Sequence, residues 1–193
     1  MVSEGIAGLM SNKIAKWQKS IGLACLDCGN LMLSRRMFVD LHRMISANGP
    51  MQQEDYFHEY MRDTYVAHVF MSLRRHIKIH RDSISLSGVV LDMLENAGEL
   101  ANASNLGELR AAYADFREKA TKVEGFADRV VAHHDRSPPR HIPTYREIDE
   151  AIESMDRLAV QASLAAGGSY SDTCEPTVQG GWLNVFRDMG VEF

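Results

Sequence analysis

The sequence predicts an all-α protein, an antiparallel helical bundle of about five helices with an N-terminal helical arm and a short docked segment near the C-terminus. Three observations lead to this fold. Apolar residues recur at the three- and four-residue spacings of one helix face through most of the chain. No run alternates apolar and polar residues between turn signals, as a strand would. Sequences rich in glycine or proline separate the helical segments and allow the chain to reverse direction.

The chain begins with a predicted helical arm over residues 1–28. A short amphipathic helix is expected over 12–21, because its apolar side chains fall on one face. These side chains are Ile14, Trp17 and Ile21. We expect the arm to lie along the main bundle, which is predicted over residues 29–168.

Two longer helices follow the arm. The first is predicted over 30–46, and the Asn-Gly-Pro sequence at 48–50 ends it. The second is predicted over 54–79, a stretch without glycine or proline whose length is natural in a bundle. The apolar stripes of the two helices consist of Leu31, Leu33, Phe38, Leu41, Met44 and Ile45, and of Phe57, Tyr60, Met61, Tyr65, Val69, Phe70, Leu73 and Ile77.

A short third helix is predicted over 86–94, with Asp82 or Ser83 as its N-terminal cap. The next helical pattern starts at Asn105 and extends to Val131. Gly125 lies inside this pattern, so we expect the helix either to kink or to divide there.

The last long helix is predicted from Thr144 to the glycines at 167–168. Thr144 and Glu147 have the spacing of a capping box, in which each side chain bonds the backbone of the other residue. Residues 169–193 are predicted to form a mobile loop, rich in glycine, serine and threonine, and a C-terminal anchor. The anchor side chains are Trp182, Leu183, Val185 and Phe186.

Composition narrows the class of protein. The chain has 193 residues, of which 45% are hydrophobic and 24% charged, so it can bury the core of one domain. A formal net charge of -5 argues against a protein that coats nucleic acid. Charged residues interrupt the apolar residues of 1–33, so the sequence predicts neither a signal peptide nor a membrane span. We therefore expect a soluble, cytoplasmic protein with no membrane partner.

The cysteines do not predict disulfides. Cys25, Cys28 and Cys174 are an odd number, and thiols are normal in a reducing compartment. The Cys25-x-x-Cys28 sequence has the start of a zinc motif, but no second cysteine pair follows and Cys174 is distant in sequence. We expect core or surface thiols, and neither a metal nor another cofactor.

The densest polar cluster of the sequence covers residues 128–136. Its candidate catalytic residues are Arg129, His133 and His134, because arginine fits phosphate oxygens and histidine transfers protons near neutral pH. Supporting residues of the cluster are Asp128, Asp135 and Arg136. Two prolines at 138–139 end the helix, which places the histidines in its last turn. The alternative interpretation is that the residues of this cluster are solvated side chains at a helix end without a catalytic role.

The same region resembles the HEPN superfamily, in particular its abortive-infection, AbiU-like branch. The resemblance rests on Ala132-His133-His134-Asp135 after Arg129, and on the Pro-Thr-Tyr-x-Glu helix start at 143–147. Three further sequences are similar to that branch: Arg74-Arg75, the stretch from Arg81 to Leu86, and Trp182-Leu183-x-Val185-Phe186. The resemblance covers residues 31–186.

This resemblance implies an all-α homodimer that brings two Arg-x(4-6)-His motifs together in a cleft and cleaves RNA without a metal. It also implies a role as a toxin or in phage defence, with a neutralising antitoxin protein as a further partner. Four residues separate Arg129 from His134, the family minimum, whereas three separate Arg129 from His133. With 100° per residue in an α-helix, His133 is expected near the face of Arg129 and His134 about 140° away.

Two other functions remain open from the sequence. One is a catalytically silent HEPN module that only dimerises or binds a nucleotide or a partner. The other is a metal-dependent hydrolase, because His76 and His80 have the i,i+4 spacing of helical metal ligands. His42, His58 and His68 are the histidines that this last hypothesis would add.

Overall fold

The computed structural model describes residues 2–53, 56–80, 82–132, 141–169, 172–177, 181 and 184–188. Within these ranges it is an all-α bundle without strands, as the sequence predicts. The α-helices are α1 (Val2–Ala47), α2 (Tyr56–Ile77), α3 (Leu86–Glu95), α4 (Leu106–Phe126), α5 (Tyr145–Ala165) and α6 (Asn184–Asp188). Short 3-10 helices are η1 (Gly49–Gln52), η2 (Ala97–Glu99) and η3 (Ala103–Asn105), and η4 (Ala127–Ala132) is a π-helix.

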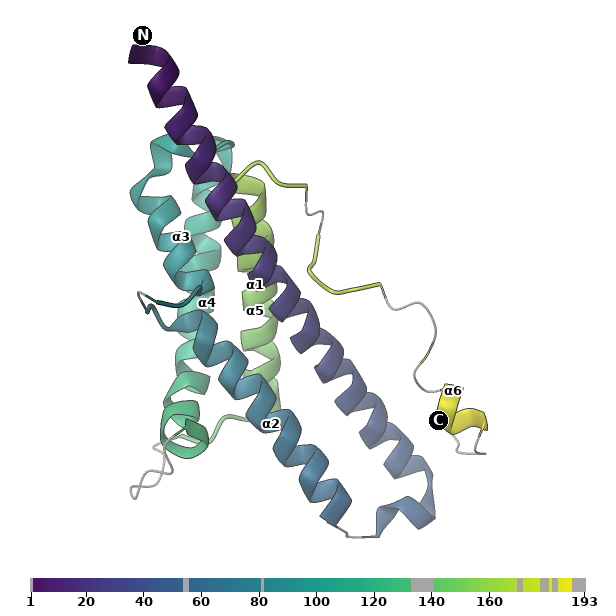
Figure 1. Ribbon diagram of the computed structural model, residues 1–193. Coiled ribbons are helices and arrows are strands. Elements are labelled where there is room, and N and C mark those ends of the chain that lie inside the picture. The colour runs from purple at the N-terminus through teal and green to yellow at the C-terminus, as the bar shows by residue number, and fades with distance from the viewer. Residues whose placement is uncertain are drawn as a thin grey trace.

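The long helix α1 runs the full length of the molecule (Figure 1). Helix α2 returns antiparallel to α1, and α3 continues in the direction of α2 toward the opposite end. Helices α4 and α5 form an antiparallel pair behind them and pack on α1, α2 and α3. The core therefore lies where these five helices meet. None of the described helices is long and apolar enough to cross a membrane.

Helix α1 is continuous, although the sequence predicts two separate helices over 12–21 and 30–46. Its buried stripe continues through Ala24, Cys25 and Cys28, so the small and thiol side chains carry the apolar face across the expected gap. Packing of this face on α5 outweighs the helix-weakening effect of Gly22 and Gly29.

Polar contacts fix α1 against its neighbours. Trp17 is buried and donates its Nε1–H to Asp92 of α3 over 2.7 Å. Arg35 pairs with Asp149 at 2.8 Å and with Glu153 at 3.0 Å, both on α5. These contacts bind the two halves of α1 to different parts of the bundle.

Helix ends follow local sequence signals, with one correction. Thr144 and Glu147 form the predicted capping box at the start of α5. The cap of α3 is Ser85, whose hydroxyl accepts the N–H of Gly88, and not Asp82 or Ser83 as predicted. Gly167 ends α5 with φ at +76°, a left-handed conformation that glycine adopts without a steric penalty.

The described part of the predicted C-terminal anchor is the short helix α6, Asn184–Asp188. Phe186 of α6 lines an apolar pocket together with Met37 of α1 and with Phe57 and Met61 of α2. Of the other predicted anchor residues, Trp182 and Leu183 lie outside the described residues, and so does the side chain of Val185.

Candidate functional site

The candidate site begins where α4 changes into the π-helix η4. Helix α4 passes straight through Gly125, and the winding changes two residues later. A π-helix uses i→i+5 hydrogen bonds and is frequent at functional sites. The 100° per residue of an α-helix therefore does not apply to Ala127–Ala132, and the expected angles between Arg129 and the two histidines lose their basis.

Arg129 lines a pocket of about 350 Å³ between the end of α4 and the start of α5. Lys122, His141 and Glu147 also line this pocket. The remaining lining residues are Thr121, Gly125 and Phe126. Two fixed positive charges, one imidazole and the Glu147 carboxylate surround this hollow, and Oε1 of Glu147 lies 3.9 Å from Nζ of Lys122.

His141 is a site residue that the sequence analysis missed. Its Nε2 lies 3.0 Å from Oε2 of Glu147. The same carboxylate oxygen accepts the backbone N–H of Thr144 at 2.9 Å and the Thr144 hydroxyl at 3.1 Å. The N–H of Thr144 is the largest cause that lowers the pKa of Glu147 below its ordinary value, and His141 lowers it further. The helix cap therefore holds His141 beside the pocket of Arg129.

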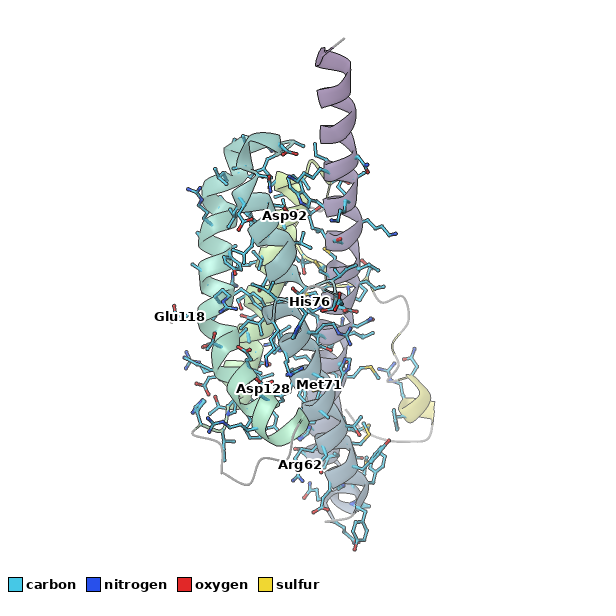
Figure 2. All side chains as sticks on the ribbon, turned by 60° about the vertical axis from the view of Figure 1, so that its left-hand side comes forward. Arg62, Met71, His76, Asp92, Glu118 and Asp128 are labelled. Atoms are coloured by element: carbon cyan, nitrogen blue, oxygen red, sulfur yellow. The ribbon has the colours of Figure 1, made fainter. Side chains whose placement is uncertain are left out.

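Asp128 points away from this pocket, toward α2. It accepts hydrogen bonds from Arg74 and Lys78, and Figure 2 shows it next to α2. Burial acts to raise the pKa of Asp128, but the bonds from Lys78 and Arg74 and their charges outweigh burial and lower it. Asp128 thus fastens η4 to α2.

The predicted site residues divide into two groups. The structure describes Arg129, at the pocket, and Asp128, at α2. His133, His134, Asp135 and Arg136 lie outside the described residues. They belong to the eight residues between Ala132 and His141, and of the described residues on either side of this stretch, Arg129 and His141 line the pocket.

The proposed metal pair His76 and His80 is not brought together. His76 is buried, and its Nε2 lies 3.1 Å from Oδ2 of Asp27, while its Nδ1 accepts the N–H of Leu86 at 3.3 Å. Both ring nitrogens are thus engaged, between α1 and α3 (Figure 2). His80 is exposed. Among the described residues, no group of three close candidate ligands includes a histidine.

One such ligand group exists elsewhere in the described structure. Cys28, Asp156 and Cys174 are all buried, and their ligand atoms lie within 4.8 Å of one another. Asp156 lies nine residues beyond Glu147 on α5, about 13 Å away at the rise of an α-helix. This group is therefore separate from the pocket of Arg129.

Comparisons with known proteins identify a family. The family model HEPN_AbiU2, described as AbiU2, matches residues 30–177 of the chain. This range covers the bundle from the second half of α1 onward, the residues that line the pocket, and the sequence that contains His133 and His134. No curated protein and no solved structure gives a match.

Proposed function

The chain belongs to the AbiU2 family of HEPN domains, and from this premise we propose that it is a metal-independent endoribonuclease that acts in phage defence or as a toxin. The observation that carries the proposal is the pocket that Arg129 and His141 line together, and in the sequence His133 and His134 lie between these two residues. A guanidinium and imidazoles are the groups that phosphodiester cleavage without a metal requires.

Arg129 has the role of stabilising charge. The phosphorane that forms during attack on the phosphorus carries negative charge on its oxygens, and a fixed guanidinium stabilises that charge. Lys122 lines the same pocket and adds a second cation for binding the RNA backbone.

A histidine has the role of moving the proton. His134 or His133 removes the proton of the 2′-hydroxyl, so that this oxygen attacks the adjacent phosphorus. The bond between phosphorus and the 5′-oxygen breaks, and the 5′-oxygen leaves as a hydroxyl after it takes a proton from solvent or from a protonated histidine. The product carries a 2′,3′-cyclic phosphate. His141, which Glu147 holds in place, contributes to binding of the phosphate next to Arg129.

The active form is proposed to be a homodimer. One arginine and one histidine make a sparse site for phosphoryl transfer, and a second copy would supply the same groups across a cleft. Activity per chain should then fall when the protein is diluted below the concentration at which it dimerises. Activity per chain that stays constant in a protein shown to be monomeric by light scattering would contradict the composite site.

The decisive experiment is cleavage of a labelled RNA by the purified chain with a chelator present. We expect cleavage, with products that carry 2′,3′-cyclic phosphate ends. Absence of cleavage by a folded wild-type dimer on a broad set of RNAs would instead support a catalytically silent binding module. A neutralising antitoxin is proposed as a partner, and co-expression with each neighbouring gene, scored by rescue of growth, tests it.

A further inference from the structure

The three cysteines of the chain converge on one buried carboxylate. Cys25 and Cys28 lie one turn apart on the same face of α1, Asp156 lies on α5, and Cys174 lies in the segment that follows α5. All four residues are at least nine-tenths buried. The Cys174 thiol has hydrogen-bond contacts with the thiols of both Cys25 and Cys28. Three separate parts of the chain thus contribute to a single cluster.

The backbone is shaped to bring Cys174 to α1. A Cβ atom on Gly29 would lie 2.7 Å from the carbonyl oxygen of Cys174 and 3.3 Å from Cδ of Pro176. Only glycine at position 29 therefore lets this segment approach the helix so closely. The glycine follows Cys28 directly, so the close approach occurs beside the two α1 thiols.

Hydrogen bonds hold the Asp156 carboxylate next to two of the cysteines. Its side chain accepts the backbone N–H of Cys174 at 2.6 Å, and the thiol of Cys28 lies 4.0 Å away. Both contacts reach the same oxygen, Oδ1, and a thiol is a weak donor. These two contacts fix Oδ1 of Asp156 beside the Cys28 thiol and the backbone of Cys174.

We propose that Cys25, Cys28, Cys174 and Asp156 form a zinc site. Three thiolates and one carboxylate match the preference of Zn²⁺ for sulfur ligands in a closed tetrahedral shell. In such a shell, zinc–sulfur bonds of about 2.3 Å place neighbouring sulfurs about 3.8 Å apart. The ligand atoms of Cys28, Asp156 and Cys174 already lie within 4.8 Å of one another. Cys25, one turn before Cys28 on the same face of α1, is the ligand that would complete the shell.

Binding of zinc requires the thiols to lose their protons. The hydrogen bond with Cys25 lowers the pKa of the Cys174 thiol, but the bond with Cys28, burial and the charge of Asp156 together raise it well above its ordinary value. Without the metal this thiol is neutral. Each thiol passes one proton to solvent as its Zn–S bond forms, so zinc affinity rises with pH.

The site is structural. Its four ligands fill the shell and leave no open position for a substrate. The ion would fasten the segment of residues 172–177 to α1 and α5, and Figure 1 shows this segment returning along α1 after α5. The inference is independent of the proposed RNA cleavage, which uses a different part of α5.

Metal analysis of the full-length protein tests the site directly. The protein is purified from cells grown with added zinc, dialysed, and analysed for zinc and for free thiols. We expect close to one zinc per chain and thiols that react only after the metal is removed. Replacement by Co²⁺ should give the visible absorption bands of a tetrahedral thiolate site.

Amino-acid substitutions test which side chains bind the zinc. Cys174→Ser and Asp156→Asn should lose the zinc, whereas Glu175→Gln should keep it. Glu175 is the matched control, because it is an exposed carboxylate next to Cys174. If Asp156→Asn does not fold, the Co²⁺ spectrum of the wild type shows whether the metal is bound by thiolates in a tetrahedral shell. Three free thiols and no bound metal in zinc-treated wild type, a disulfide between two of these cysteines, or full zinc occupancy in Cys174→Ser would each overturn the proposal.

Discussion

Nε2 of His141 lies 3.0 Å from Oε2 of Glu147, inside the pocket that Arg129 also lines. This contact links a helix cap to the candidate site, because Glu147 belongs to the capping box of α5. His141→Ala should weaken RNA binding about tenfold, the effect of losing one charge-assisted hydrogen bond of about 1.5 kcal/mol. The weaker binding should appear as a higher KM, with little change in kcat. An unchanged KM would contradict a role of His141 in RNA binding. The control is His80→Ala, which changes an exposed histidine.

Arg129→Ala should abolish RNA cleavage while the helical content and the dimer persist. The side chain lines the pocket and is only partly buried, so its loss should change the free energy of unfolding by about 0.5 kcal/mol or less. Arg129→Lys should fail as well, because an ammonium does not reproduce the planar fork of a guanidinium on phosphate. Arg110→Ala, at an exposed arginine of α4, is the matched control. An Arg129→Ala variant that cleaves RNA as fast as the wild type would contradict the proposed role of Arg129.

Separate His133→Ala and His134→Ala variants identify the general acid or base. Loss of such a group costs on the order of 100- to 10,000-fold in rate. We expect this loss in kcat for His134→Ala, because His134 keeps the family spacing from Arg129, and a much smaller effect for His133→Ala. Single-turnover cleavage at saturating protein measures the chemical step. Full activity in both variants would contradict an acid–base role for either histidine.

The helices of the bundle could be predicted because each carries an apolar stripe with a helical period. The continuity of α1 could not, because Gly22 and Gly29 interrupt the pattern and only packing on α5 outweighs their effect. The π-helical winding of η4 was also missed. The contacts of η4 with α2, such as the bond of Asp128 with Arg74 at a sequence separation of 54, appear in no local pattern.

Two buried polar residues carried a signal that was overlooked. His76 lies three residues after Leu73 and seven after Val69, so it continues the buried face of α2. Asp156 likewise lies four residues after Ile152 on the buried face of α5. Periodicity could have shown their burial. It could not have shown that Cys174 joins Cys25 and Cys28, because that contact connects segments almost 150 residues apart.

Thr144→Ala should destabilise the protein by about 1 kcal/mol, because it removes the hydroxyl that accepts the N–H of Glu147 at 3.2 Å. The variant should also weaken RNA binding, since Glu147 then loses part of the support that positions His141. Thr144→Ser keeps the hydroxyl and should behave like the wild type in urea unfolding and in KM. Equal stability of the alanine and serine variants would contradict the contribution of the cap.

His76 should make the stability of the fold depend on pH. Burial lowers the pKa of His76 below its ordinary value, Arg75 acts in the same direction, and Asp27 opposes them. The unfolded chain therefore binds the proton more readily than the folded chain. Stability from this group is fully present above the ordinary histidine pKa of about 6.5 and is lost as the pH falls below it.

Urea unfolding at a series of pH values between neutral and mildly acidic measures this loss. The wild type should become less stable as the pH falls, and His76→Gln should show a shallower slope even though the substitution itself lowers stability. His80→Gln is the matched control and should keep the wild-type slope, because His80 is exposed. A His76→Gln slope equal to that of the wild type would mean that protonation of the buried imidazole does not oppose folding. The contact of His76 with Asp27 would then hold the ring in the folded state in either charge form.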